Sequence, residues 1–151
     1  MRRGLVLFVR SMLLVPIVLG IMAPLLFKIH IYKSSETIYH LLSGICHQAY
    51  SRSFWVAGVP IGICARCSGI YIGLFLSSFG SLFNYKCQYK YTFGLLLIIP
   101  LAIEKTAFSS FSISNTIRFI VGILVGFGGG IVFYSLIKKL IFALNIFQKE
   151  V

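Results

Sequence analysis

Four hydrophobic stretches divide the chain, and most of its polar residues lie between them. The stretches run from 5 to 27, 61 to 83, 91 to 108 and 117 to 137. A bilayer core of about 30 Å requires roughly 20 apolar residues in helical form, and each stretch meets or nearly meets this length. The third is the weakest because Pro100 interrupts it. The pattern predicts an all-α integral membrane four-helix bundle that forms a single transmembrane domain over residues 1–151.

The first stretch contains a cation, Arg10, and a proline, Pro16. We expect Pro16 to bend this helix and Arg10 to snorkel toward the headgroups. Arg2 and Arg3 precede the stretch as in a signal peptide, but the stretch is long and no small-x-small cleavage site follows it. We therefore expect an uncleaved helix.

A shorter amphipathic segment, SSETIYHLLSGI, separates the first and second stretches. Ile38, Leu41, Leu42 and Ile45 share one face at helical spacing, and a serine at position 34 or 35 can cap its start. A short helix with one apolar face is typical of a segment lying on the membrane surface. We expect an interfacial helix between the first and second transmembrane helices.

The composition supports a membrane protein over a nucleic-acid-binding one. Hydrophobic residues make up 58% of the chain, and the formal charge of +11 comes from 14 Lys and Arg against 3 acidic residues. These cations cluster between the hydrophobic stretches instead of lining an extended soluble face interleaved with aromatics. We expect membrane lipids as partners and no nucleic acid.

The distribution of cations predicts an orientation. With four crossings, one side carries seven (Arg2, Arg3, Lys86, Lys90, Lys138, Lys139 and Lys149) and the other carries four (Lys28, Lys33, Arg52 and Lys105). The side richer in cations faces the cytoplasm. Both termini should therefore be cytoplasmic in a plasma (inner) membrane, with the polar segments at 46–54 and 64–67 together at the outer face.

Three cysteines and a histidine are candidate metal ligands at that face. Cys64 and Cys67, in a CxxC motif near a helix start, place their sulfurs on one side, and Cys46 and His47 complete the ligand types of a Cys₃His zinc site. Adjacent residues point in different directions, so Cys46 and His47 cannot both bind one ion unless the backbone turns sharply there. His40 is a substitute ligand. Zinc is the expected cofactor.

Two other states of the thiols remain open. Outside the cytoplasm an unpaired thiol tends to be oxidised, so a structural disulfide from Cys46 to Cys64 or Cys67 would staple the loop to the helix. Alternatively the protein is a membrane thiol-disulfide oxidoreductase in which Cys64 attacks and Cys67 resolves. Cys87, in the predicted cytoplasmic loop, should be a reduced bystander.

An excess of cations near the thiols indicates an anion site. Arg52, Arg66 and Arg118 face a single nearby carboxylate, Glu104. Guanidinium groups bind phosphate and carboxylate bidentately, so an anionic lipid or a lipid-linked anionic substrate is the natural ligand. Glu104 and His47 are then candidate catalytic groups, although Glu104 could instead only neutralise an arginine.

Glycines recur every four residues on the second and fourth stretches. They are Gly69 and Gly73, then Gly122, Gly126 and Gly130. Such spacing lets helix backbones approach closely, which could serve internal packing or a homo-oligomer.

The motifs CHQ, RSF, CARCSGIYIG and SNTIRFIVGILVG, in this order, resemble a family of small integral membrane proteins known as domain of unknown function 2085, over about residues 40 to 130. The matching positions are Cys46, His47, Gln48, Arg52, Ser53, Cys64, Arg66, Cys67, Gly69, Tyr71, Gly73, Asn115, Arg118 and Gly122. The family pattern has an acid followed by glycine after the third stretch, whereas here Glu104 precedes Lys105. The resemblance implies where a site lies and supplies no activity. Whether the protein is an enzyme stays open.

Overall fold

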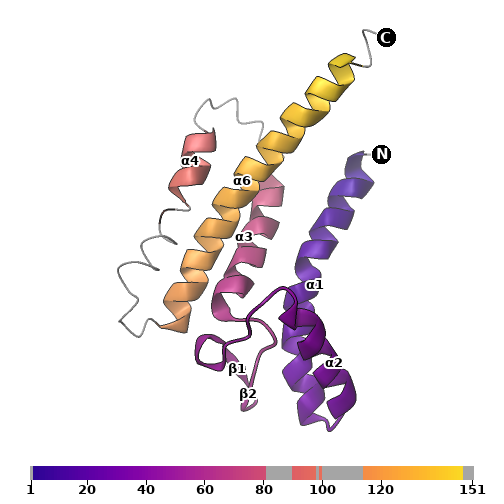
Figure 1. Ribbon diagram of the computed structural model, residues 1–151, viewed down its shortest axis with the longest axis vertical. Coiled ribbons are helices and arrows are strands. Elements are labelled where there is room, and N and C mark those ends of the chain that lie inside the picture. Colours follow the sequence, from indigo (N-terminus) through magenta and orange to yellow (C-terminus); the bar gives the residue numbers. More distant parts are fainter. Residues whose placement is uncertain (1, 81–89, 98, 100–113, 148–151) are drawn as a thin grey trace.

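The computed structural model describes residues 2–80, 90–97, 99 and 114–147, and these residues fold mainly into helices (Figure 1). The helices are α1 (Arg2–Lys28), α2 (Tyr32–Ser43), α3 (Ala65–Gly80), α4 (Lys90–Leu96) and α6 (Asn115–Phe147). A 3-10 turn, Tyr50–Arg52, and an antiparallel hairpin of β1 (Trp55–Val56) and β2 (Val59–Pro60) lie between α2 and α3. The helical class is confirmed, and the hairpin is an element that the hydrophobic pattern did not predict.

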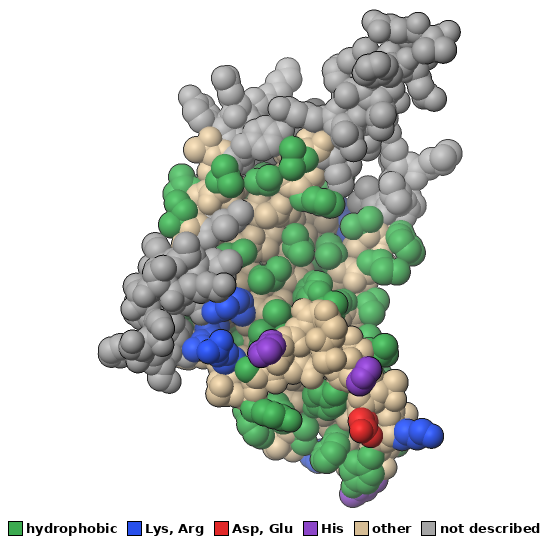
Figure 2. Space-filling model, in the orientation of Figure 1, with side chains coloured by type: hydrophobic (Ala, Val, Ile, Leu, Met, Phe, Trp, Pro, Cys, Tyr) green, Lys and Arg blue, Asp and Glu red, His purple; other side chains and the backbone are tan. Residues whose placement is uncertain are grey.

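Two of the described helices contain segments long and apolar enough to cross a membrane. These segments are Phe8–Lys28 of α1 and Asn115–Leu136 of α6. By contrast α3 has 16 residues, which span about 24 Å at 1.5 Å per residue. Large hydrophobic side chains are exposed along both long helices, and Figure 2 shows such side chains spread over the visible face. The four-span bundle stays a prediction, since residues 98 and 100–108 of the third stretch lie outside the described residues.

Helices α3 and α6 pack through their glycines. A Cβ added at Gly73 would lie 2.6 Å from the backbone nitrogen of Phe127, and Gly69 meets Gly122 in the same way one turn earlier. Because residue numbers rise together along the two contacting faces, α3 and α6 run in the same direction. The glycine spacing therefore serves internal packing, as the sequence indicated.

Helix α4 packs on the other side of α6 and runs opposite to it. Gly94 lies against Val132, and Leu97 lies against Gly128. Residue numbers therefore rise along one segment as they fall along the other, which is antiparallel packing. This direction returns the chain from the end of α3 toward the start of α6. A third crossing requires such a return.

Arg10 joins α1 to α3. Its Nε donates to the hydroxyl of Ser78 at 3.1 Å, its Nη2 donates to the Ser78 carbonyl at 3.1 Å, and its guanidinium lies 4.2 Å from the ring centre of Phe79. The start of α1 thus faces the end of α3, where a hydroxyl, a carbonyl and an aromatic face satisfy the cation. The expectation that Arg10 snorkels toward the headgroups stays a prediction.

Helix α2 confirms the short helix expected after α1. Leu42 is buried and Ile38 is half-buried, whereas Leu41 and Ile45 are exposed. Ser35 does not cap this helix, because its hydroxyl is buried and donates to the Ala23 carbonyl at 2.8 Å. That bond docks α2 onto α1, while its placement on a membrane surface stays a prediction.

The described elements divide between two ends of the molecule. In Figure 1 the start of α1 and the end of α6 lie at one end, and α2, the hairpin and the start of α3 lie at the other. The candidate site residues that the structure describes fall at the second end. The side of a membrane that each end faces, and the cytoplasmic placement of both termini, stay predictions.

Candidate metal centre

Three cysteine sulfurs converge at the end of the molecule that carries the hairpin. The Sγ atoms of Cys46, Cys64 and Cys67 all lie within 4.8 Å of one another. Cys46 follows α2, Cys64 immediately precedes α3, and Cys67 lies in the first turn of α3. None of the three is in a disulfide. The sequence prediction that the two polar segments share one centre is confirmed for the thiols.

The start of α3 places Cys64 and Cys67 on one side. The Cys64 carbonyl accepts the first-turn bond from the Ser68 N–H at 3.0 Å and a second bond from the Ser68 hydroxyl at 3.1 Å. Residues three apart across a helix start lie one above the other, which brings the two sulfurs together. The sequence pattern began the helix at 61, but α3 begins at Ala65. Cys64 therefore stands at the helix N-terminus, whose positive end favours a thiolate.

Cys46 is the acceptor within the cluster. Its side chain is 4% exposed, and its sulfur accepts the backbone N–H of Cys64 at 3.2 Å. Hydrogen bonds from the Cys64 side chain first, then from the Cys67 side chain, together with the backbone N–H groups of Cys64 and Gln48, lower the pKa of the Cys46 thiol well below its ordinary value. This position is therefore set up to hold a thiolate, the form that binds metals.

The hairpin brings the two cysteine segments together. Its turn residues, Ala57 and Gly58, both have positive φ (54° and 82°), as a two-residue type I′ turn requires. The Ile61 N–H donates to the Phe54 carbonyl at 2.9 Å and extends the pairing. The chain thus reverses, and Ile61 and Ile63 return to pack with Leu42 and Cys46 in one buried cluster.

A proline in α1 anchors the segment before Cys64. Pro24 has no N–H, so the Gly20 carbonyl four residues earlier loses its helical partner. The Gly62 N–H takes that carbonyl at 2.9 Å. Side chains would not fit here, since a Cβ on Gly62 would lie 2.8 Å from Leu42 Cδ1 and a Cβ on Gly20 would lie 2.8 Å from Ile63 Cγ1. This contact was not predicted from the sequence, although a proline four residues after a glycine was its signal.

The histidines lie outside the three-sulfur group. His47 is exposed, and the sharp backbone turn needed to bring it to the sulfur of Cys46 falls one residue later, at Gln48 (φ 47°). His40 is also exposed, on α2. Within the described residues the potential metal ligands that cluster are the three cysteines. The roles assigned to His47 as ligand and catalytic group stay predictions.

The arginines lie at the same end as the thiols. Arg66 and Arg118 occupy the first turns of α3 and α6, their Nε atoms are buried, and the Arg66 carbonyl packs against Gly122. Arg52 is exposed in the 3-10 turn, which is tied to the start of α6 by the Asn115 side-chain amide, a donor to the Ser53 carbonyl at 3.1 Å.

The anion pocket built from these arginines stays a prediction. Glu104 and Lys105 lie outside the described residues, as does Cys87. The structure therefore describes the three arginines predicted for that pocket, whereas the acid expected beside them lies outside the described residues.

Fold and site define a helical protein of the membrane class with a three-thiol cluster at one end. Residues 46–132 match the family described as "Predicted membrane protein (DUF2085)", and the chain belongs to this family. The matched region begins at Cys46 and contains all three thiols of the cluster. The resemblance noted from the motifs is thereby confirmed.

Relatives in two archaea are uncharacterized. An uncharacterized protein of Methanocaldococcus jannaschii is 35% identical over 112 residues, which cover 68% of this chain and 68% of that protein. An uncharacterized protein of Methanothermobacter thermautotrophicus is 35% identical over 91 residues, covering 56% of this chain and 79% of that one. No solved structure matches.

Proposed function

We propose that Cys46, Cys64 and Cys67 hold a thiophilic metal ion, with zinc the first choice. The observation that carries this proposal is the convergence of three free sulfurs within 4.8 Å of one another. Zn–S bonds of about 2.3 Å in tetrahedral array separate sulfurs by about 3.8 Å. The sulfurs would therefore have to approach one another by at most about 1 Å to bind the ion. Thiolate ligands select zinc, copper(I) and iron–sulfur clusters over hard cations.

The three-thiolate set leaves a fourth position for chemistry. With that position open, zinc supplies Lewis-acid activation of a bound group, whereas a fourth protein ligand makes the ion structural. In the open case Arg52, Arg66 and Arg118 hold the anionic part of a lipid-linked substrate. His47 and Glu104 then move protons during hydrolysis or group transfer.

Elemental analysis of the detergent-purified protein tests the metal proposal. The wild type should carry about one metal ion per chain, and Cys64→Ser should carry almost none, because two sulfurs bind too weakly to survive purification. Cys87→Ser is the matched control and should keep the metal. The proposal would be contradicted if the wild type carried no metal, or if Cys64→Ser carried as much metal as the wild type.

A thiol-disulfide oxidoreductase is the second candidate. It is favoured by the same three cysteines, which form no disulfide, and by the lowered pKa of the Cys46 thiol. In this reaction two thiols lose two electrons and two protons to a disulfide of a partner protein, and a disulfide forms within the cluster. Alkylation of membranes before and after reduction, followed by mass spectrometry, should find the Cys64–Cys67 pair in both states. A permanent bridge to Cys46 would instead indicate a structural staple.

A further inference from the structure

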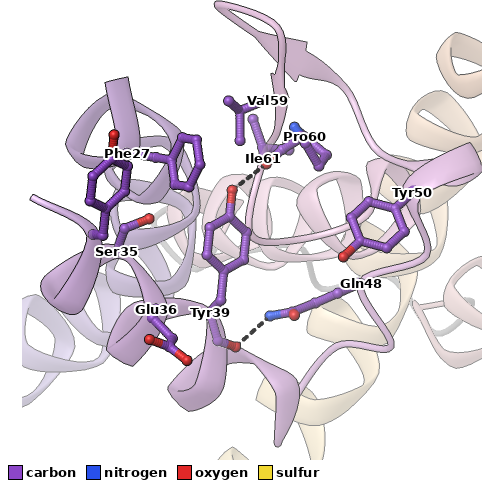
Figure 3. A pocket seen from close by; sticks show the side chains of 10 residues that line it. Phe27, Ser35, Glu36, Tyr39, Gln48, Tyr50, Val59, Pro60 and Ile61 are labelled. Atoms are coloured by element: carbon purple, nitrogen blue, oxygen red, sulfur yellow. Dashed lines mark hydrogen bonds between the residues drawn. The ribbon is translucent and has the colours of Figure 1, made fainter. Parts of the chain in front are cut away.

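A cavity of about 430 Å³ lies beside α2, at the same end of the molecule as the thiols but lined by none of them. Its walls come from the end of α1, from α2 and from the segment around the hairpin. Figure 3 shows the ring of Tyr39 in the middle, with Phe27 on one side and Tyr50 on the other. Tyr32 adds a fourth aromatic side chain to the lining. Aromatic rings therefore form much of this surface.

Three hydrogen-bond donors of the cavity are already bonded within the protein. The Tyr39 hydroxyl donates to the Pro60 carbonyl, and the Gln48 amide nitrogen donates to the Tyr39 carbonyl at 2.7 Å (Figure 3). The Ser35 hydroxyl donates to the Ala23 carbonyl. Left for a ligand are the Tyr50 hydroxyl, which can donate or accept, the Gln48 side-chain oxygen, the Glu36 carboxyl group and the ring faces. The cavity thus offers mainly acceptors and π-electron surface.

The charge of the cavity lining also favours a cationic ligand. Among the residues that the structure describes, Glu36 lines the cavity and no Lys, Arg or His does, although the chain carries 14 Lys and Arg against 3 acids. Lys33, one turn earlier on α2, is not part of the lining. In Figure 2 the acidic side chain that is visible stands at this end of the molecule. An acid at an aromatic cavity in so basic a chain favours a cationic ligand over an anionic one.

We propose that this cavity binds the ammonium group of a small organic cation. The faces of Tyr39, Tyr50 and Phe27 attract the cation through their ring quadrupoles, and the Glu36 carboxylate neutralises it. Gln48 lies near the thiol cluster, because its side chain lines the cavity and it follows Cys46 by two residues. The proposal requires no metal in that cluster.

Calorimetric titration with choline tests the proposal on the full-length protein in phosphatidylglycerol nanodiscs. Choline should bind at least about tenfold more tightly than its neutral isostere, 3,3-dimethylbutan-1-ol, because only choline carries the charge. Glu36→Gln and Tyr50→Leu should each weaken choline binding by about tenfold for the same reason. Both side chains are exposed, so neither change threatens the fold. Lys33→Gln and Trp55→Leu, exposed residues outside the lining, are the matched controls and should not weaken choline binding.

Nanodiscs of phosphatidylcholine separate the two sources of the ammonium group. If the headgroup of the lipid occupies the cavity, free choline no longer binds in these nanodiscs; if the ligand is a soluble cation, choline binds as before. Equal affinity for choline and its isostere, unchanged binding in Glu36→Gln, or no binding of choline at all would overturn the proposal.

Discussion

Cys46 shows how much one side chain can contribute at this site. Its buried sulfur accepts the Cys64 N–H and belongs to the three-sulfur group, so it supports both the loop and the proposed metal. The side chains of Leu42, Ile61 and Ile63, which share its buried cluster, are apolar and offer no acceptor for that N–H. The packing and the chemistry of the site therefore meet at this residue.

Substitution of Cys46 should separate these two contributions. Cys46→Ala leaves the part-buried Cys64 N–H without its acceptor, which costs about 1 kcal/mol, whereas Cys46→Ser keeps an oxygen acceptor. We expect the free energy of unfolding in detergent, followed by circular dichroism, to fall further in the alanine variant, with metal lost from both. Equal stability of the two variants would show that the N–H to sulfur bond contributes little.

The sequence predicted the thiol residues better than their neighbours. CxxC at a helix start fixes the side on which Cys64 and Cys67 lie, so their meeting could be predicted from helical geometry. His47 is instead exposed, and the positive φ falls at the next residue, Gln48, which no pattern of apolar residues reveals. The partners of Arg10 were not predicted because Ser78 and Phe79 are distant from it in sequence.

At the scale of elements, the contact between α3 and α6 positions the site. Both helices begin beside the thiols, and their backbones touch through glycines over the following turns. A side chain in that contact has no room, while a side chain on another face of α6 meets open space. The same substitution of glycine by alanine should therefore affect stability very differently at these two kinds of position.

Alanine substitutions in α6 test this contact. A Cβ at Gly126 would collide with the Ile70 carbonyl, whereas a Cβ at Gly129 has no atom within 4 Å. Gly126→Ala should therefore destabilise the protein by about 1–3 kcal/mol. Gly129→Ala, the matched control, should be neutral or stabilising because alanine favours helix. Thermal unfolding in detergent measures both, and similar midpoints for the two variants would exclude close packing at Gly126.

The elements that the sequence did not predict are those in which the backbone makes non-helical contacts. Residues 61–64 continue an apolar stretch and were expected to be helical, but Gly62 donates to the carbonyl left free by Pro24. The hairpin has strands of only two residues, too short for a period-2 pattern to appear. Long apolar helices such as α1 and α6 were predictable because the length of an apolar stretch can be counted directly in the sequence.

At the scale of the whole molecule, the direction of the helices matters for the orientation of the protein in the membrane. The start of α1 and the end of α6 share one end, and the hairpin marks the other (Figure 1). Cation counts predict that the hairpin end faces outward. The exposed turn residue Ala57 is a suitable reporter because it stands clear of the thiol cluster.

Labelling of the Ala57→Cys variant with a membrane-impermeant maleimide in intact cells tests the orientation. The variant should be labelled more than the wild type without permeabilisation, because the hairpin faces outward in the proposed topology. A green fluorescent protein fused after Val151 should fluoresce, as it does in cytoplasm. Labelling that requires permeabilised cells would place the thiols on the cytoplasmic side.

X-ray absorption at the zinc edge, on the zinc-loaded full-length protein, tests the central claim most directly. Three cysteine thiolates predict three sulfur scatterers at about 2.3 Å and one lighter atom in the fourth position. Cys87→Ser should give the same spectrum, and Cys67→Ser should lose the zinc–sulfur signal, because two sulfurs bind the ion too weakly to retain it. A first shell of nitrogen and oxygen alone, or with fewer than three sulfurs in the wild type, would contradict a metal centre built on Cys46, Cys64 and Cys67.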